Sequence, residues 1–528
     1  MTSTVRVCDD FDVILSTIAD ESKRRDRDSV RERLRPLTDT TPLSLLPVCN
    51  RPFISYQLDL ILKYGFPRII VAVREDEKDI LETYVKGYLE ECGSKTELIF
   101  VDVRPDLSDA EALREVARRK NLVRQNHFIF VGCDVLVESG IMRAADVHRM
   151  QGATVTMSFK ERTSQETQKK KAKDKKAIAR LKKYKTKEFV GLDRGDDSWR
   201  ISPSCGSVSR SAEFSRVVYF RRTASLGTED PVVEIPKVLL AAHPRLTLFS
   251  DLEDTQIYIF SSWVLDLLLV HGETIGSIKD DLLPFIVNRD GRPISDVMPA
   301  AIPEKTSPLR RQSSTESTAS DGADLSKLAS VKCSVFGVLH PFGGAFSGRI
   351  STVADYLQLN RDLATKNNKN RRPIAPWKQV CVGVGKEKLL KNGAKDGMEK
   401  AEVSVYRKLL MDSVIDRDHL PTVMGEKTRI ANCVIGKNVT VGANVKLNGC
   451  VIMDDVEIAD NCTVQHSVLC TGAKVSATCS LNDCQIGPKY VLREKSRING
   501  ESRSLPAVSR GPAGLVPASP VLTGKFAS

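Results

Sequence analysis

Thiol groups are the reactive side chains that stand out first in this sequence. Its 528 residues include 13 cysteines, six of them between Cys433 and Cys484. None stands in the paired C-x-x-C spacing that structural zinc sites favour. A disulfide framework is typical of secreted chains, and the N-terminus lacks the basic and apolar segments of a secretory signal. We therefore predict buried free thiols that pack as small apolar side chains, with no metal site and no cofactor.

Positive charge is the second feature that could carry function. The net charge is +12, and residues 160–187 hold 13 Lys or Arg against 3 Asp or Glu, a local charge of +10. The rest of the chain is close to neutral, whereas a general nucleic-acid-binding protein spreads its positive charge over a folded face. We interpret the segment as a solvated insert. A weak RNA contact through residues 160–187 is the alternative.

Composition excludes several protein classes. Hydrophobic residues make up 41% and charged residues 28% of the chain, which are the values of a globular protein. The best apolar stretch, residues 263–270, is too short to cross a bilayer and carries Asp266. We therefore expect no membrane association and a cytosolic protein.

Residues 11–159 show the pattern of an α/β domain. Short β-branched runs alternate with amphipathic segments, which predicts βαβ units, a mostly parallel sheet and a ligand edge at the carboxyl ends of the strands. One helix is expected to begin with Pro52 at its first position and to end at Gly65. A second helix should end at Gly93, with one apolar stripe formed by Ile80, Leu81, Tyr84, Val85, Tyr88 and Leu89. Strands are expected at residues 11–15, 68–73, 97–103, 127–132 and 153–159.

Beyond this pattern, two polar stretches interrupt the domain. The Lys-rich insert is assigned to residues 160–198 and a Ser-rich insert to residues 301–330. Core-like patterning returns at residues 232–243, 254–269 and 280–288. A helix over about 352–364 then ends the domain.

Hexad periodicity defines the last structured region. Aliphatic residues recur every six positions at Ile435, Val441, Leu447 and Met453, and the series continues at Ile458 and Val464 after one shortened step. This period is typical of a parallel β-helix, in which each short strand buries one aliphatic side chain. We expect small residues in the stack at Cys433, Cys450, Cys462 and Cys470.

An α/β domain followed by a hexad β-helix resembles the nucleotide-sugar pyrophosphorylase family. Residues 33–61, RLRPLTDTTPLSLLPVCNRPFISYQLDLI, resemble that family's R-L-x-P-L-T signature. Residues 346–363 and 423–470 resemble the gamma-subunit family of eukaryotic translation initiation factor 2B. The implied fold is a nucleotidyltransferase-like (Rossmann-like) α/β domain followed by a left-handed parallel β-helix.

The departures from the pyrophosphorylase pattern are concentrated at its active site. The family's G-G-x-G-T-R loop should follow the first strand, yet the first glycine of this chain is Gly65. Leu43 stands where the signature has a Lys, and residues 108–113 lack the Gly-Thr of the stretch that holds the base and sugar. Asp134 matches the metal-binding Asp. The resemblance implies only a vestigial pocket, formed by Arg33, Leu43, Asp109 and Asp134, with no catalytic residue.

The resemblance therefore implies a non-catalytic gamma-type subunit. Its complex is the guanine nucleotide exchange factor for initiation factor 2, and the expected partners are an epsilon-type subunit, the other subunits and initiation factor 2. The epsilon subunit adds a C-terminal helical catalytic module, which the residues after Gly500 do not match. The alternative is a nucleotide-sugar (GDP-mannose-type) pyrophosphorylase or its regulatory subunit. The predicted organisation is residues 1–365 nucleotidyltransferase-like, 366–422 linker, 423–500 β-helix and 501–528 disordered tail.

Overall fold

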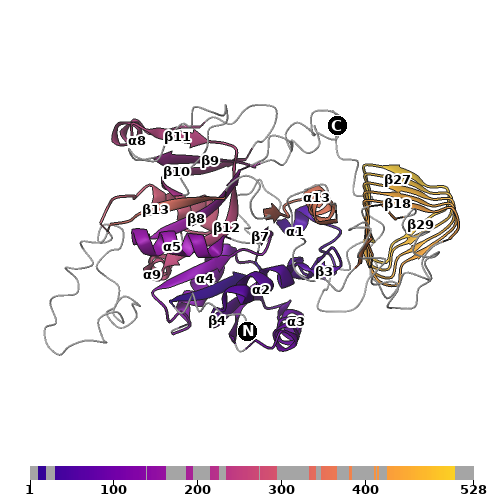
Figure 1. Cartoon of the computed structure of the whole chain (residues 1–528), viewed down its shortest axis with the longest axis horizontal. Coiled ribbons are helices and arrows are strands. Elements are labelled where there is room, and N and C mark those ends of the chain that lie inside the picture. Colours follow the sequence, from indigo (N-terminus) through magenta and orange to yellow (C-terminus); the bar gives the residue numbers. More distant parts are fainter. Residues whose placement is uncertain are drawn as a thin grey trace. The chain divides into compact units, whose positions relative to one another are not determined.

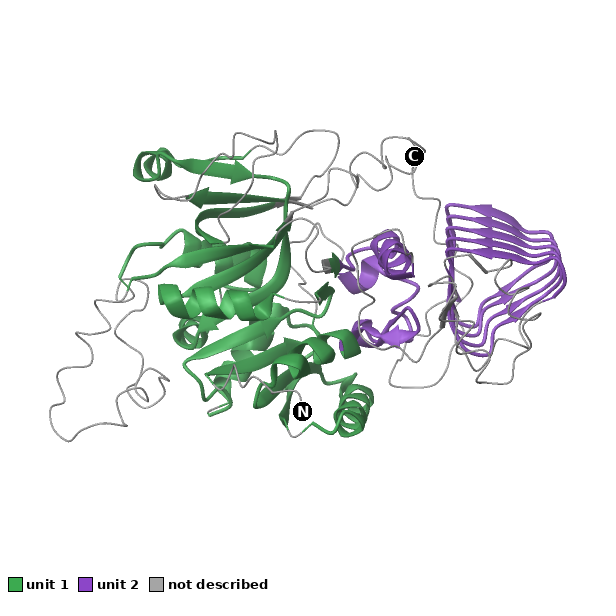
Figure 2. Cartoon of the chain, in the orientation of Figure 1, with its two compact units in different colours: residues 1–29, 55–348 green, residues 30–54, 349–528 purple. Residues whose placement is uncertain are grey.

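The computed structural model divides into two compact units, coloured separately in Figure 2. Unit 1 comprises residues 1–29 and 55–348, and unit 2 comprises residues 30–54 and 349–528. Within them the structure describes residues 10–18, 30–94, 96–119, 121–137, 140–161, 186–193, 214–224, 233–272, 274–293, 332–340, 347–364, 380–382, 410–411, 413–415 and 425–505.

Unit 1 is built on a ten-stranded sheet with the order β11-β9-β10-β13-β8-β12-β6-β1-β4-β5. The five strands predicted from the sequence are all present. In sheet order the strands are β11 (Leu246–Phe249), β9 (Thr186–Asp193), β10 (Phe214–Ala224), β13 (Val335–His340), β8 (Val155–Glu161), β12 (Leu252–Ser261), β6 (His127–Val131), β1 (Phe11–Ser16), β4 (Arg68–Arg74) and β5 (Glu97–Val103). A short strand β7 (Val135–Val137) follows β6 and pairs with β14 (Ser347–Arg349).

The expectation of a mostly parallel sheet is wrong for the sheet as a whole. The strands β6, β1, β4 and β5 are parallel, as is the pair β13 and β8. However, β12 lies antiparallel between β6 and β8, and β9, β10 and β11 pair antiparallel. Strand direction depends on long-range connections, which an apolar run buried on both faces does not encode.

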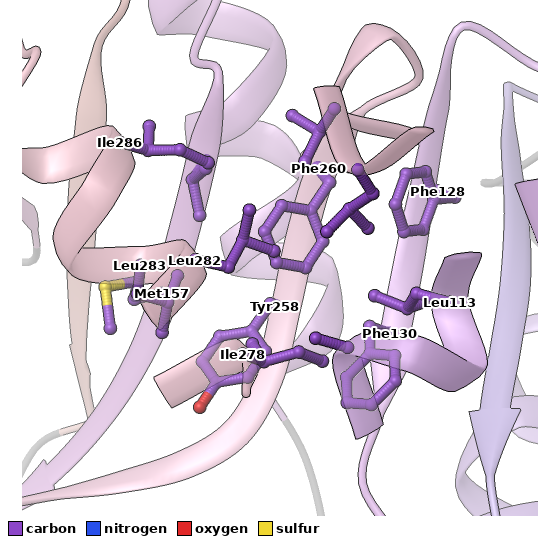
Figure 3. Packing of buried hydrophobic residues seen from close by; sticks show 14 of the residues in the cluster. Leu113, Phe128, Phe130, Met157, Tyr258, Phe260, Ile278, Leu282, Leu283 and Ile286 are labelled. Atoms are coloured by element: carbon purple, nitrogen blue, oxygen red, sulfur yellow. The ribbon is translucent and has the colours of Figure 1, made fainter. Parts of the chain in front are cut away.

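Helices cover the sheet of unit 1, as Figure 1 shows. They are α2 (Phe53–Tyr64), which begins in the last residues of the 30–54 segment, α3 (Lys78–Glu91), α4 (Asp109–Arg118), α5 (Ile141–Gln151), α8 (Lys237–Ala242), α9 (Trp263–Val270) and α10 (Leu283–Val287), with a π-helical turn η2 (Ile278–Leu282) before α10. Phe128 and Phe130 of β6, Tyr258 and Phe260 of β12 and Leu113 of α4 pack in one buried cluster (Figure 3). This cluster fixes α4 and η2 against the middle of the sheet.

Three local predictions need correction. Pro52 lies in the short strand before α2 and is not its first residue. On α3 the stripe Leu81, Val85 and Leu89 is buried, but Ile80 is 58% exposed. The apolar residues of α8 are not core either, since Val238 is 80% exposed.

The predicted Lys-rich insert is also too long. Residues 186–193, which fall inside the assigned 160–198 range, form the sheet strand β9, with Val190 and Leu192 fully buried. Residues 162–185, 194–200 and 301–331 lie outside the described residues, so the other insert assignments stay predictions.

Unit 2 contains the β-helix, whose parallel ladders from β18 (Arg429–Ala431) onward join residues 17 positions apart, for example Leu447 to Val464. Its three sheets have the orders β15-β17-β19-β22-β25-β28-β31, β16-β18-β21-β24-β27-β30 and β20-β23-β26-β29. The strands are β15 (Val380–Val382), β16 (Leu410–Met411), β17 (Ser413–Ile415), β18 (Arg429–Ala431), β19 (Val434–Ile435), β20 (Thr440–Val441), β21 (Lys446–Asn448), β22 (Val451–Ile452), β23 (Glu457–Ile458), β24 (Thr463–Gln465), β25 (Val468–Leu469), β26 (Lys474–Val475), β27 (Ser480–Asn482), β28 (Gln485–Ile486), β29 (Val491–Leu492), β30 (Arg497–Asn499) and β31 (Ser502–Arg503).

The 17-residue coil corrects one assignment of the hexad series. Ile435 pairs with Ile452, so Ile452 occupies the inward position and Met453 lies outside the internal core cluster. Each coil therefore contains two steps of six and one of five, and the short step precedes Ile452. Asn444 and Asn461 turn one corner in the left-handed region, with φ of 55° and 58°. The strands β15, β16 and β17 also begin the stack within the segment assigned as linker.

The segment 30–54 and helix α13 (Val353–Ala364) belong to unit 2 with the β-helix. The segment comprises α1 (Val30–Arg33), η1 (Leu43–Leu45) and a hairpin of β2 (Pro47–Val48) and β3 (Arg51–Pro52). The Cys49 backbone N–H donates to Asn360 Oδ1 at 2.8 Å, and Asn50 Nδ2 donates to the Ile435 carbonyl at 2.6 Å. Arg361 donates to the Gly449 carbonyl at 2.9 Å. The hairpin and α13 are thus bonded to successive coils.

We predict that Val441→Asp destabilises unit 2, because Val441 is 5% exposed and faces the internal core. An unpaired carboxylate at that position should cost several kcal/mol, on the order of 3 kcal/mol or more. The measurement is urea denaturation followed by circular dichroism. The matched control is Thr440→Asp, whose side chain faces solvent one residue earlier. Equal midpoints for the two variants would show that the assigned register is wrong.

Candidate functional site

Directly after the carboxyl end of β6 lies Asp134, the residue that matches the metal-binding Asp of the pyrophosphorylase family. Its side chain is buried in the turn between β6 and β7. Gln57 of α2 holds this turn by donating from Nε2 to the carbonyls of Gly132 at 2.6 Å and Val135 at 2.9 Å. The turn is therefore fixed by an amide side chain.

Several acidic side chains surround this turn. Burial raises the pKa of the Cys133 thiol well above its usual value, and the carboxylates of Asp134, Asp109 and Glu77 raise it further. Asp109 and Asp134, two of the four residues of the predicted pocket, thus lie in one electrostatic environment within unit 1. A ligand carrying phosphates would meet negative charge here.

Asp109 and its neighbours cap the start of α4. Ser108 and Glu111 form a capping box, in which Glu111 accepts hydrogen bonds from the Ser108 backbone N–H at 2.9 Å and hydroxyl at 3.0 Å. Asp109 Oδ1 accepts from the Ala110 backbone N–H at 2.8 Å and from Ile278 N–H at 3.1 Å. The residues that stand in place of Gly-Thr at this position thus cap the N-terminus of their own helix, α4.

A capped helix N-terminus has a direct consequence for ligand binding. Free N–H groups at a helix start form an anion site, which is how many proteins bind phosphate. Here carboxylates of the chain itself take up those donors and link α4 to η2. The N-terminus of α4 is therefore bonded to η2 at the place where a nucleotide enzyme would hold its substrate.

Sequence reasoning missed a buried charge network beside this edge. Lys279 of η2 is 1% exposed, and its Nζ lies 2.8 Å from Asp254 Oδ2 and 3.4 Å from Glu188 Oε1. Glu188 Oε2 also accepts from the Asp254 backbone N–H at 3.1 Å. Burial raises the pKa of Asp254, and the Lys279 charge opposes that rise.

A second buried pair lies next to it along the chain. Arg222 of β10 donates to both carboxylate oxygens of Asp280, at 2.9 and 2.7 Å. The signal in the sequence was the run of charged residues 279–281 directly before an apolar helix. Such residues are rarely buried unless they are paired.

Ser158, in the middle of β8, and His340, at the carboxyl end of β13, form another contact, with Ser158 Oγ 2.6 Å from His340 Nε2. Burial lowers the pKa of His340 to about 4, assisted by the charge of Arg143, so the imidazole is neutral at pH 7. The left-handed Gly140 lies against the ring, where a Cβ would come within 2.1 Å of Cε1. Ser158 is itself 1% exposed, so the pair serves packing.

Arg33 and Leu43, the other two residues of the predicted pocket, belong to unit 2. Leu43 begins η1 and is buried, as expected of an apolar side chain in place of a lysine. Arg33 ends α1 and is half-buried. The segment that replaces the glycine loop, residues 19–29, lies outside the described residues. A pocket formed by all four residues therefore stays a prediction.

The cysteines of the β-helix have a structural explanation. Cys433, Cys450, Ser467 and Cys484 stand in one column, 17 residues apart. Cys450 Sγ donates to the Asn448 carbonyl at 3.3 Å, and the Cys450 backbone N–H donates to Cys433 Sγ at 3.5 Å. Ser467 and Cys484 repeat this pattern two coils on. Nine of the ten described free cysteines are buried, which confirms the predicted buried thiols for those nine.

Within the described residues, no group of three or more His, Cys, Asp or Glu side chains is arranged to hold a metal ion. Among the same residues, no helix is long and apolar enough to cross a membrane.

Known proteins match both parts of the chain. A family model described as nucleotidyl transferase matches residues 31–169, and one described as the EIF2B subunit epsilon LbH domain matches residues 400–498. Translation initiation factor eIF2B subunit gamma of Dictyostelium discoideum is 28% identical over 353 residues, covering 64% of this chain and 73% of the relative. The chain is thus similar to eIF2B subunit gamma.

Other relatives show how much of the chain resembles eIF2B subunit gamma and how much resembles a nucleotide-sugar enzyme. The eIF2B subunit gamma of Schizosaccharomyces pombe is 25% identical over 256 residues and covers 48% of each chain. The mannose-1-phosphate guanyltransferase of Eremothecium gossypii is 33% identical, but over 126 residues that cover 24% of this chain and 34% of the enzyme. This enzyme match covers a quarter of the chain, a smaller share than either match to eIF2B subunit gamma. The left-handed β-helix expected from the sequence is confirmed.

We predict that His340 makes the stability of unit 1 depend on pH. Its pKa is lowered from 6.5 to about 4 in the folded protein, so between these pH values the unfolded chain binds more protons. Stability is therefore fully present above pH 6.5 and declines as the pH falls toward 4, by up to about 3 kcal/mol. The measurement is the free energy of unfolding of wild type and His340→Gln at several pH values.

The variant should show a flatter dependence over that pH window. His271→Gln serves as the control, because it removes a histidine from the same unit. An unchanged slope in His340→Gln would contradict the assignment.

Proposed function

We propose that this chain is a non-catalytic gamma-type subunit of the eIF2B complex, the guanine nucleotide exchange factor for initiation factor 2. The observation that carries the proposal is the match to eIF2B subunit gamma over 64% of the chain. The pairing of a nucleotidyl transferase match with an EIF2B β-helix match supports it, because the two matches fall in order along one chain.

The loss of enzyme chemistry is supported by three features. The N-terminus of α4 is capped by Ser108 and Glu111, Leu43 is buried where the signature has a Lys, and the charges of Asp254 and Lys279 are paired with each other. Removing one preorganised charge-stabilising group typically costs about 10²–10³ in rate. The loss of the glycine loop and the lysine together leaves no useful phosphoryl transfer.

In this proposal the chain acts through assembly. It binds an epsilon-type subunit and the other subunits in the cytosol and helps to hold initiation factor 2. The complex then favours the nucleotide-free state of its GTPase by binding that state more tightly, which requires no covalent step. The weak RNA contact of residues 160–187 stays a prediction, since nearly all of that segment lies outside the described residues.

The alternative is a GDP-mannose-type pyrophosphorylase or its regulatory subunit. The mannose-1-phosphate guanyltransferase relatives favour it, but they match only 24% of the chain. Purification of the tagged chain from its native cells separates the two proposals. Recovery with initiation factor 2 and related subunits supports the exchange complex, whereas recovery with a sugar nucleotidyltransferase contradicts it. GDP release from initiation factor 2 is then compared for the complex with and without this chain.

We predict that Leu43→Lys restores no pyrophosphorylase activity, because a lysine without the glycine loop cannot close the site on a triphosphate. The measurement is nucleoside triphosphate formation from GDP-mannose and pyrophosphate, with a mannose-1-phosphate guanyltransferase as positive control. Leu43→Met, which keeps an apolar side chain of similar volume, controls for loss of folding. Turnover by the lysine variant above that of wild type would show that the site is not degenerate.

A further inference from the structure

One outer face of the β-helix carries a regular array of cations and amides. It is the solvent side of the sheet formed by β18, β21, β24, β27 and β30, in which the central residues Ile430, Leu447, Val464 and Leu481 point inward. The flanking positions point outward in two columns, because each ladder joins residues 17 apart. We call this surface the amide face; its residues are Arg429, Lys446, Thr463, Ser480 and Arg497 in one column and Asn448, Gln465, Asn482 and Asn499 in the other.

The cations of this face are available to a partner. Arg429, Lys446 and Arg497 are exposed, and none has an ion pair with any residue that the structure describes. The outward positions of these five strands include no Asp or Glu. Their local charge is therefore +3 on a flat surface.

The neighbouring sheet of the β-helix differs from the amide face in that its exposed cation is paired. The outward residues of β20, β23, β26 and β29 are Thr440, Glu457, Lys474 and Val491. There Lys474 Nζ lies 2.9 Å from Glu457 Oε1, so the cation is neutralised by the adjacent coil. The remaining sheet is joined to the hairpin 47–52 through Asn50, which donates to the Ile435 carbonyl of β19, whereas Arg361 of α13 donates to the Gly449 carbonyl at the corner between β21 and β22.

The amide column adds a second kind of contact. Asn482 Nδ2 donates to Asn499 Oδ1 at 3.2 Å, so these two side chains are linked across successive coils. Successive coils are about 4.8 Å apart, which places amide donors and acceptors at a fixed repeat. An extended polypeptide presents N–H and C=O groups that such amides can bind.

We propose that the amide face binds an extended acidic segment of a partner protein. The unpaired cations attract its carboxylates, as charge-assisted hydrogen bonds, while the amide column holds its backbone. Single-stranded nucleic acid is disfavoured because the outward positions of these strands offer no aromatic side chain on which bases could stack. The inference rests on the β-helix alone and does not depend on the proposed function.

The test uses the full-length chain and a local readout, because residues 160–187 also attract anions. A photo-crosslinking amino acid is placed at Ser480, in the middle of the amide face, and separately at Thr440 on the neighbouring sheet. The probe is a fluorescent peptide of twelve glutamates. We expect crosslinking from Ser480 to exceed that from Thr440 and to fall as salt rises.

The charge-reversal variant combines Arg429→Glu, Lys446→Glu and Arg497→Glu. Because three attractive contacts are replaced by repulsive ones, crosslinking from Ser480 should fall about ten-fold. The matched control combines Lys437→Glu, Lys474→Glu and Lys489→Glu, which changes net charge equally and should reduce it less than about two-fold. The neutral variant with Gln at positions 429, 446 and 497 repeats the test if charge reversal unfolds the stack.

Two results would overturn the proposal. Equal losses in the charge-reversal and control variants would mean that net charge alone attracts the peptide. Stronger crosslinking at Ser480 to a twelve-nucleotide RNA than to the peptide would assign the face to nucleic acid.

Discussion

Buried charges must be paired, and this requirement constrains how the segments of unit 1 pack around the Lys279 network. Lys279, Asp254 and Glu188 come from η2, β12 and β9, which are far apart in the sequence, and each is at most 4% exposed. Leaving any one of them unpaired would cost several kcal/mol, on the order of 3–5. The network therefore ties η2 to β12 and β9.

The same requirement connects the fold to its proposed role. In an enzyme the positive and negative groups at such an edge would be balanced by substrate and metal. In this chain Arg222 is matched by Asp280, and Asp109 is matched by backbone N–H groups of α4 and η2. Charges that balance internally stabilise one conformation and leave little driving force for a phosphate ligand. That is the behaviour expected of a scaffold subunit, whose rigidity presents surfaces to partners.

Local patterns in the sequence predicted local structure well. The five strands of residues 11–159 and helix α13 were predicted because apolar period and breaker residues are encoded nearby. Strand direction, the membership of residues 186–193 in the sheet and the Lys279 network were missed, since they depend on contacts between distant segments. Met453 was misplaced for a different reason: a run of two aliphatic residues, Ile452 and Met453, satisfies either phase of a hexad pattern. Only the pairing of successive coils distinguishes the phases.

The 17-residue coil also limits how this chain can change over evolution. Because the β-helix columns repeat every 17 residues from β18 onward, inserting or deleting one residue within a strand would turn the side chains that follow it in that strand to the opposite face. The rod can therefore change length only by whole coils, in steps of about 4.8 Å. Extra residues can otherwise be accommodated only as loops at the corners. The distances between groups along the faces of the β-helix are therefore restricted to multiples of the spacing between coils.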